Sequence, residues 1–429
     1  MLKSNFVKFY AALAALLALA AFAKPKPGDP DFFPVMGWDV DAEFQGKFTV
    51  EFFQEMADAG FNIAGIFGGH ENIKMLAQVD GLYCWAYLGE ANQAWQRHAE
   101  DDKAYADAVA ADLAAYADLP GIYGYFVTDE PTAEHFPFLG KVARELKAQA
   151  PGSPWYLNLL PIIVNPRDLK ADSSQDYVQK YIDACQPAWV GYDNYPLMED
   201  GSLRADHWDQ LQQFREVTQR NHLPFQACVL LSAHMDYRVV SQDDLFFEVY
   251  AALLYGAKGI QYFNYWPPPR SNYRMAPVDQ VGNKTATWHH VKAVNDTVHV
   301  LAHILNRLES TAVYHFQPGE PMKGENPAPQ DSIVADPGSP DIALAVGEFR
   351  DVVNGDCYVM LLNKNLKASA NLNNIQWRRK PASIQVCSPF KAGKFLPGAP
   401  NPFYGEDAYV APGHALLLKL TFDDVPQAD

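Results

Sequence analysis

Two adjacent acidic residues, Asp129 and Glu130, follow the apolar and aromatic run "GIYGYFV" and stand directly before Pro131. A third acid, Asp193, follows a second such run in "AWVGYDNYP". Burial and a neighbouring carboxylate raise the pKa of a carboxyl group, so that it can hold a proton near neutral pH. These residue types therefore predict acid–base chemistry, with a proton-donating carboxyl group and a second carboxylate, which is what glycosidic-bond cleavage requires.

Glu130 is the predicted proton donor, because its longer side chain reaches further into a cleft. Asp129 is predicted to support it and to point elsewhere, since neighbours on a strand face opposite sides. The alternative is that one of the two acids caps the helix that follows Pro131. Asp193 is the predicted second catalytic carboxylate, with an Asx turn as its alternative role. The alternative candidates for the second carboxylate are Glu90, Asp39 and Asp236. A Glu130–Asp193 separation of roughly 5 Å would indicate a nucleophile, and roughly 6.5–9.5 Å would leave room for a water.

The segments that must position these acids alternate regularly between positions 34 and 310. Eight short apolar runs begin at Val35, Phe61, Leu82, Ile122, Trp155, Ala188, Pro224 and Gly259, and amphipathic helical stretches separate them. Near-continuously apolar strands alternating with helices are typical of a parallel (β/α)₈ barrel, a TIM barrel, which we assign to residues 24–310. Short alternating runs between Pro, Gly and Asn turns then predict a small antiparallel β-sandwich over residues 311–429.

A barrel of this kind carries its active site where the strands end. The acids and aromatic or hydrogen-bonding residues at those positions form the predicted site. Glu130 and Asp193 are assigned to catalysis, and the predicted substrate-binding residues are Trp38, Asp39, His70, Glu90, Asp129, Asn158, Tyr195, His234, Asn264 and Trp266. Trp38, Tyr195 and Trp266 are expected to stack on sugar rings. The His and Asp spacing does not suit a metal site, and neither a metal nor a cofactor is predicted.

The composition of the chain indicates which classes of molecule it can bind. The formal net charge of −17 disfavours nucleic acid and anionic membranes, whereas the 13% of aromatic residues suits a carbohydrate. Lys3 and Lys8 precede an apolar run that ends in the small-x-small sequence "AFA", which predicts a cleaved signal peptide over residues 1–23 and a secreted or periplasmic protein. The run is too short for a convincing membrane span, so no membrane insertion is predicted. Cys357 and Cys387 lie in the same C-terminal region and could form a disulfide in such an oxidising compartment.

With these features, residues 34–310 resemble the secreted (β/α)₈ glycoside hydrolases of the clan-A-like superfamily, in which a small C-terminal β domain is a common companion. The supporting stretches are "GYFVTDEP", "YDNYP" and "GIQYFNYW". The resemblance implies that Glu130, at the end of strand four, is the acid/base. The chain departs from the family pattern twice, with Asp129 in place of Asn before that glutamate and with no glutamate at the end of strand seven. Other barrel glycosidases pair strand four with strand six, as Glu130 and Asp193 would.

The sequence is compatible with three functions. The first is an exported glycoside hydrolase that cleaves O-glycosidic bonds of a poly- or oligosaccharide. The second is a carbohydrate-binding barrel without catalysis, which the missing strand-seven glutamate suggests. The third is another hydrolase or lyase on the same barrel, which would reveal itself by dependence on added metal or on a uronic acid.

Overall fold

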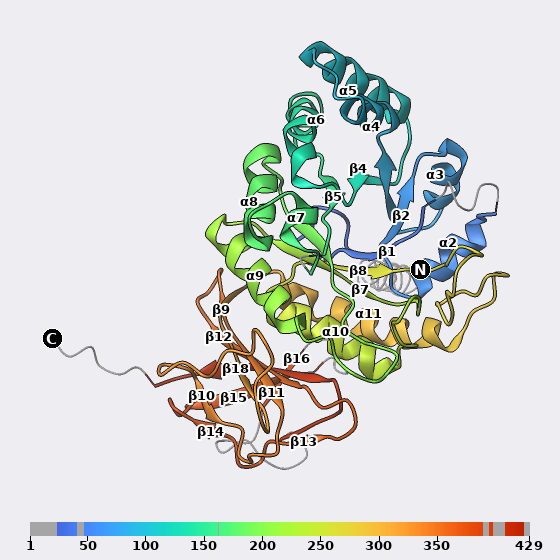
Figure 1. Ribbon diagram of the computed structural model, residues 1–429. Coiled ribbons are helices and arrows are strands. Elements are labelled where there is room, and N and C mark those ends of the chain that lie inside the picture. Colours follow the sequence, from blue (N-terminus) through green and yellow to red (C-terminus); the bar gives the residue numbers. More distant parts are fainter. Residues whose placement is uncertain (1–23, 41–46, 162, 389–393, 398–407, 424–429) are drawn as a thin grey trace, which may run out of the picture.

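The protein consists of a parallel barrel followed by an antiparallel β domain (Figure 1). A computed structural model describes residues 24–40, 47–161, 163–388, 394–397 and 408–423. The predicted signal peptide, residues 1–23, lies outside the described residues. The fold class predicted from the sequence is confirmed in both of its parts.

The barrel strands run in the spatial order β5-β4-β3-β2-β1-β8-β7-β6. Their bounds are β1 (Val35–Gly37), β2 (Ile63–Phe67), β3 (Tyr83–Tyr87), β4 (Ile122–Asp129), β5 (Trp155–Asn158), β6 (Val190–Asp193), β7 (Phe225–Leu230) and β8 (Ile260–Phe263). A parallel bridge between Leu159 and Tyr192, with the Leu159 N–H donating to the Gly191 carbonyl at 3.1 Å, joins β5 to β6. The eight strands therefore close on themselves.

Helices surround the strands (Figure 1). They are α2 (Val50–Asp58), α3 (His70–Leu76), α4 (Gly89–Gln96), α5 (Asp102–Tyr116), α6 (Phe136–Gln149), α7 (Pro166–Leu169), α8 (Ser174–Cys185), α9 (His207–Arg220), α10 (Gln242–Leu254) and α11 (Ala286–Leu305), with a 3₁₀ turn, η2 (Ala133–His135), before α6. Side-chain caps start several of them: Ser241 and Asp244, for example, form a reciprocal capping box at the start of α10.

The interior of the barrel is aromatic. One buried cluster contains Met36, Trp38, Ile63, Ile66, Trp85, Phe126, Tyr156 and Trp189. Such large side chains fit only where neighbours are small, and Gly191 supplies the space: a Cβ there would lie 2.9 Å from the Tyr156 ring and 3.0 Å from the Trp189 ring. The Tyr156 ring stacks on Trp189 with centroids 4.4 Å apart. This packing fixes Tyr156, whose hydroxyl group reaches the polar residues at the barrel mouth.

The β domain has one six-stranded sheet in the order β16-β15-β18-β12-β11-β9, and two ribbons, β10-β14 and β13-β17, cover it. The strands are β9 (Leu308–Phe316), β10 (Val334–Asp336), β11 (Leu344–Asp351), β12 (Cys357–Asn363), β13 (Ala370–Asn371), β14 (Gln376–Trp377), β15 (Ser383–Ser388), β16 (Lys394–Pro397), β17 (Tyr409–Val410) and β18 (Ala415–Thr421). All five cysteines are free. Cys357 and Cys387 stand on β12 and β15, with β18 between them, which is too far for a disulfide.

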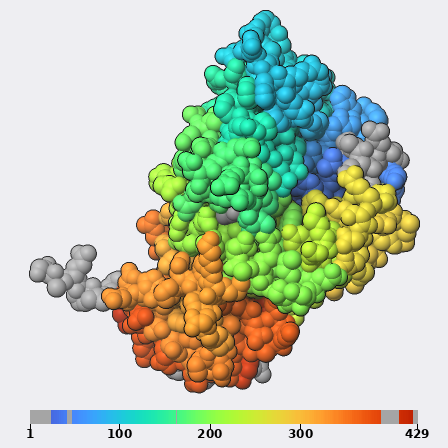
Figure 2. Space-filling view, viewed as in Figure 1, coloured from blue at the N-terminus to red at the C-terminus, as the bar shows by residue number. Residues whose placement is uncertain are grey.

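The two domains share one hydrophobic core. Every residue of α10 from Asp244 to Leu254 is buried, because the helix packs against β7 on one side and against β11 and β12 on the other. A helix that is buried around its whole circumference needs such cover on all sides. In the space-filling view the β domain, coloured orange to red, lies directly against the barrel (Figure 2). The predicted boundary after residue 310 falls inside β9, which starts at Leu308.

Candidate active site

The end of β4 turns both of its acidic residues toward the barrel mouth. Asp129 pairs in register with Asn158 on β5, and the Glu130 N–H donates to the Asn158 carbonyl at 2.9 Å. Glu130 has a left-handed backbone with φ of 48°. A side chain in this region breaks the alternation of a strand, so the expectation that Asp129 points away from Glu130 is wrong. A non-glycine residue held in this conformation is uncommon and is found preferentially at functional sites.

Asn158 links the carboxylates of two strands. Its Nδ2 donates to Asp129 Oδ1 at 3.2 Å and to Asp193 Oδ1 at 3.0 Å. Its Oδ1 accepts a hydrogen bond from the Tyr156 hydroxyl at 2.6 Å. Because both ends of this amide are engaged, Asn158 has one orientation and holds Asp129 and Asp193 on either side of it. The sequence predicted Asn158 as a substrate contact, whereas the structure shows it positioning the acids.

Glu130 and Asp193 lie in direct contact, with a hydrogen bond between their carboxyl groups. Burial raises the pKa of both groups, and for Asp193 the negative charge of Asp129 adds to the effect. Two carboxyl groups in contact resist losing both protons, so the two titrate as a coupled pair.

Asp129 is reached by solvent from the mouth, while protein atoms surround it on its other sides. This partial burial, followed by the charge of Glu130, raises the pKa of Asp129 to about 7. Three carboxyl groups on β4 and β6 thus meet with raised pKa values. Perturbed pKa values of this kind concentrate at functional sites.

The acids do not cap the following helix. The turn η2 has Thr132 as its N-cap residue, and α6 starts after His135. Pro131 is held by its carbonyl, which accepts a hydrogen bond from the Tyr177 hydroxyl at 2.6 Å. The alternative capping role for Asp129 or Glu130 is therefore not what the structure shows.

A cavity of about 240 Å³ opens beside Asp129 at the barrel mouth. Its lining contains five of the predicted site residues together with five others: Trp38, Asp39, Val40, Asp129, Phe263, Asn264, Trp266, Pro268, Arg270 and Tyr273. Asp39 is buried, and its Oδ1 accepts the Trp266 N–H at 3.0 Å, which fixes the start of the loop after β8. Trp38 packs edge-on against Phe126 and Tyr156. The cavity combines aromatic faces with polar groups, as sugar sites do.

Tyr195 and His234 stand next to this cavity within an aromatic group. The His234 ring stacks on Tyr273 with centroids 5.1 Å apart and meets Tyr195 edge-on at 5.8 Å. The His234 Nδ1 lies 2.8 Å from the Ser232 carbonyl, and burial lowers the pKa of this histidine. The Tyr195 hydroxyl lies 3.5 Å from the Cys228 sulfur. Both residues support the wall of the mouth.

His70 and Glu90 do not line the cavity. Both are exposed in the first turns of α3 and α4, and the His70 ring packs against Tyr116 with centroids 5.7 Å apart. The Glu90 N–H donates to Asp112 Oδ1 at 3.1 Å, so its backbone has a structural partner. These residues follow the ends of β2 and β3, outside the lining of this cavity.

Arg270 and Tyr273 were missed by the sequence analysis. They belong to the long segment between β8 and α11, which returns to the mouth through a bridge between Ala233 and Arg274. The only signal in the sequence is an aromatic and basic segment, "PPPRSNYRM", after the last strand. Its return to the cavity depends on pairing with the loop after β7.

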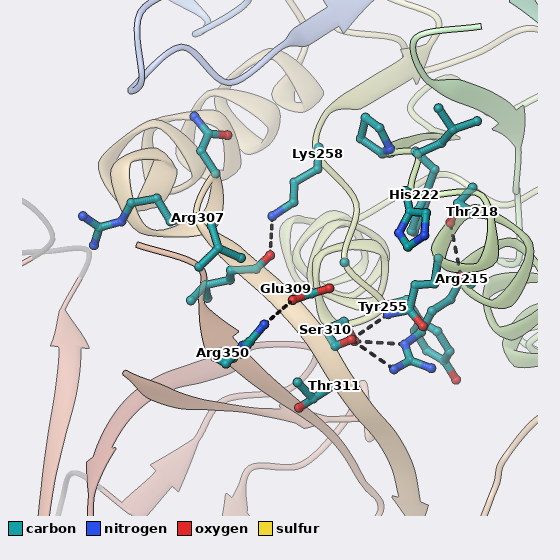
Figure 3. A pocket seen from close by; sticks show the side chains of 18 residues that line it. Arg215, Thr218, His222, Tyr255, Lys258, Arg307, Glu309, Ser310, Thr311 and Arg350 are labelled. Carbon is teal, nitrogen blue, oxygen red and sulfur yellow. Dashed lines mark hydrogen bonds and ion pairs between the residues drawn. The ribbon is translucent and has the colours of Figure 1, made fainter. Parts of the chain in front are cut away.

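A larger cavity, of about 660 Å³, lies near the start of β7 and the start of β9, away from the carboxyl ends of the strands (Figure 3). Its cations are engaged within the protein. Arg215 Nε donates to Ser310 Oγ at 2.9 Å, and Lys258 Nζ donates to the Leu308 carbonyl (Figure 3). Lys258 Nζ also donates to the Leu305 carbonyl at 2.6 Å. Burial lowers the pKa of Lys258 to about 8. These contacts fasten the barrel to β9, and this end of a barrel serves stability.

Replacing Arg215 with methionine should test this assignment. Arg215 is buried and donates to both the hydroxyl and the carbonyl of Ser310, so we expect a loss of about 1.5–3 kcal/mol in unfolding free energy. Arg350→Met is the matched control, because its ion pair with Glu309 is exposed and should contribute at most about 1 kcal/mol. Urea denaturation measures both. Equal effects of the two substitutions would contradict the assignment.

No protein-family model and no curated protein sequence matches the chain. Solved structures do match it. One is described as a "Glycoside hydrolase", with a TM-score of 0.53, 12% identity and coverage of 91% of this chain and 93% of the other. Another is a glycoside hydrolase family 5 protein from Bacteroides vulgatus, with a TM-score of 0.55, 11% identity and coverage of 93% and 90%. The chain has the fold of these two proteins. The resemblance inferred from the sequence is thereby confirmed at the level of architecture, including the C-terminal domain.

Two further observations concern the described residues. Within the described ranges, no three His, Cys, Asp or Glu side chains come together in an arrangement suited to a metal ion. None of the helices in the described part of the chain combines the length and apolar composition that a bilayer crossing demands.

Proposed function

We propose that this protein is a glycoside hydrolase in which Glu130 donates the proton to the leaving oxygen. The observation that carries the proposal is the contact between Glu130 and Asp193. Asn158 joins Asp193 to Asp129, and Asp129 lines the aromatic cavity. A carboxyl group that keeps its proton near neutral pH is what a general acid must be. The shared fold with two glycoside hydrolases supports the same proposal.

We propose that Asp193 positions Glu130, in place of the role as second catalytic carboxylate that the sequence suggested. Carboxyl groups that flank a glycosidic bond stand roughly 5 Å apart in retaining enzymes and roughly 6.5–9.5 Å apart in inverting ones. The Glu130 and Asp193 carboxyl groups are in hydrogen-bonding contact, which leaves no room for a sugar carbon or a water between them. We therefore assign Asp193 to positioning and protonating Glu130.

The substrate class follows from the cavity. About 240 Å³ is less than the ~300–1,000 Å³ of sites that enclose drug-sized ligands, so it suits one sugar unit bounded by Trp38, Trp266 and Tyr273. The test is a screen of oligosaccharides and aryl glycosides with reducing-end and chromophore readouts. Binding of a sugar without release of product from any member would favour a non-catalytic carbohydrate-binding barrel instead.

We also propose that the protein is exported and cleaved after Ala23. The basic residues Lys3 and Lys8, the apolar run and the sequence "AFA" support this. N-terminal sequencing of the protein recovered from outside the cytoplasm tests it, and a mature chain that still begins at residue 1 would contradict it.

A further inference from the structure

The long segment between β8 and α11 forms a second cavity next to the one at the barrel mouth. This cavity measures about 280 Å³, and its lining consists of Pro267, Tyr273, Arg274, Met275, Ala276, Asp279, Gln280 and Val281. Tyr273 also lines the cavity that contains Asp129. The two cavities therefore adjoin at the Tyr273 side chain.

Both charged side chains in the lining of the second cavity are engaged within the protein. Arg274 Nη2 donates to Glu199 Oε1 at 2.6 Å. Asp279 Oδ1 accepts the backbone N–H groups of Val281 and Asn283 at 3.0 and 2.8 Å, which closes a tight turn. Apart from Gln280, the rest of the lining is apolar or aromatic: Pro267, Tyr273, Met275, Ala276 and Val281.

Large apolar side chains are exposed on the two loops beside this cavity. In the described part of the chain, eight large apolar side chains are exposed, and four of them lie in the loops after β7 and β8: Met235, Val239, Met275 and Val281. Met275 is 43% exposed and Val281 is 81% exposed. Single exposed apolar residues are ordinary, but a group of them beside a cavity indicates that an apolar ligand covers them.

The backbone that carries Met275 is held in place. Ala233 and Arg274 exchange two backbone hydrogen bonds, of 3.1 and 3.0 Å, and Thr287 Oγ1 donates to the Met275 carbonyl at 2.6 Å. Met275 itself has a left-handed backbone, with φ of 53°. This conformation costs energy for a residue other than glycine and is found preferentially at functional sites. The exposure of Met275 therefore belongs to an ordered surface.

We propose that the second cavity binds the leaving group of the substrate and that this group is an apolar aglycone, an alkyl or aryl group, rather than another sugar. This inference rests on the proposed hydrolase function and specifies its substrate class. The sugar occupies the cavity that contains Asp129, and the aglycone extends past Tyr273. Hydrolysis adds water across the bond between them, so the products are the free sugar and the alcohol of the aglycone.

The chemistry of the lining distinguishes the two kinds of leaving group. A sugar unit carries several hydroxyl groups, each of which needs a hydrogen-bond partner when it is buried. Arg274 and Asp279 already have partners within the protein. An apolar aglycone needs no such partners, and it removes the surfaces of Met275 and Val281 from water, which favours binding.

The experiment compares glycosides that differ only in the aglycone. Methyl, octyl and 2-naphthylmethyl glycosides of glucose, galactose, mannose and xylose, in both anomeric forms, all release a weakly acidic alcohol, so the acidity of the leaving group does not separate them. Cellobiose, lactose, mannobiose and xylobiose carry a second sugar instead. We expect kcat/KM for the octyl or the naphthylmethyl compound to exceed that for the methyl compound at least ~10-fold, since the larger aglycone covers more apolar surface. The better of the two distinguishes an aliphatic from an aromatic aglycone.

Substitutions in the second cavity provide an independent measurement. Asparagine tolerates the left-handed backbone of residue 275, so Met275→Asn removes the apolar side chain without disturbing the chain path. Met275→Asn combined with Val281→Ser should reduce the advantage of the larger aglycone to less than ~3-fold. Val353→Ser is the matched control, because Val353 is 70% exposed in the turn between β11 and β12, and it should keep the whole advantage.

The outcomes separate this inference from the proposed function. Equal kcat/KM for the methyl, octyl and naphthylmethyl compounds, or faster hydrolysis of a disaccharide than of any of them, would overturn the inference and leave the hydrolase. A double variant that loses the same factor on methyl and octyl glycosides would overturn it as well. Hydrolysis of none of the compounds would overturn both.

Discussion

Replacing Glu130 with glutamine is expected to lower kcat at least ~1,000-fold on glycosides with poor leaving groups, while the protein still folds and binds sugar. Glutamine keeps the shape of the side chain and its contact with Asp193, but it cannot give a proton to the leaving oxygen. The loss should shrink as the leaving group becomes more acidic, because an activated phenol departs without protonation. The alkaline limb of the kcat/KM profile should disappear, because the group with the raised pKa is absent.

The measurement is steady-state kinetics with a series of aryl glycosides of graded phenol pKa, together with the pH profile of each. Glu134→Gln is the matched control, since Glu134 is an exposed glutamate in the turn after Pro131. It should behave as the wild type. An equal loss for good and poor leaving groups would mean that Glu130 is not the proton donor.

Asp193→Asn should weaken catalysis and stabilise the protein at alkaline pH. Asparagine can still accept the hydrogen bond from Asn158 Nδ2 and can donate to Glu130, but it no longer shares a proton with it. We expect kcat/KM to fall ~100-fold, with the alkaline limb moved to lower pH. The shift of that limb distinguishes a positioning residue from one that only maintains the fold.

The stability effect has a defined sign. Burial, with the charge of Asp129, raises the pKa of Asp193 in the folded protein above its unfolded value. A raised carboxyl pKa means that the folded state is favoured while Asp193 is protonated and loses this advantage as pH rises past the unfolded pKa toward the folded one. Asparagine does not ionise, so the Tm of the variant relative to wild type should increase between pH 5 and pH 9, by a few degrees.

Thermal unfolding at both pH values checks this, with the exposed Asp236→Asn as control. A Tm that falls by the same amount at every pH would show that Asp193 contributes only packing. Removal of a buried charge at a site commonly exchanges activity for stability, and this variant measures both quantities in one protein.

The barrel was predictable because its buried strands have a clear sequence pattern. Runs such as "FNIAGIF" and "PFQACVLL" are apolar along their whole length, as strands covered on both faces must be, and each leads into a helix pattern. Counting strands then placed Glu130 and Asp193 on β4 and β6, and the carboxyl ends of those strands meet at one mouth. The apolar pattern of the strands and the topology of the barrel are therefore enough to predict the architecture. They also predict half of the residues that line the cavity at the barrel mouth.

The details of the site were not predictable for local reasons. Nothing in "TDEP" reveals that Glu130 takes a left-handed backbone, which turns its side chain out of the strand alternation. The Glu130–Asp193 contact crosses β5 and depends on which way the Asn158 amide is held by Tyr156. Arg270 reaches the cavity because the loops after β7 and β8 pair at Ala233 and Arg274, a contact between segments whose sequences show no strand pattern.

The position of α10 bears on how this chain can be divided. Because this helix is covered by barrel strands on one side and by β11 and β12 on the other, neither domain has a complete interior without its neighbour. A chain that stops after α11 would turn an interior helix into a surface, with side chains such as Phe246 and Tyr250 open to water. We therefore expect the two domains to unfold as one cooperative unit, and we expect a fragment that ends after α11 to aggregate.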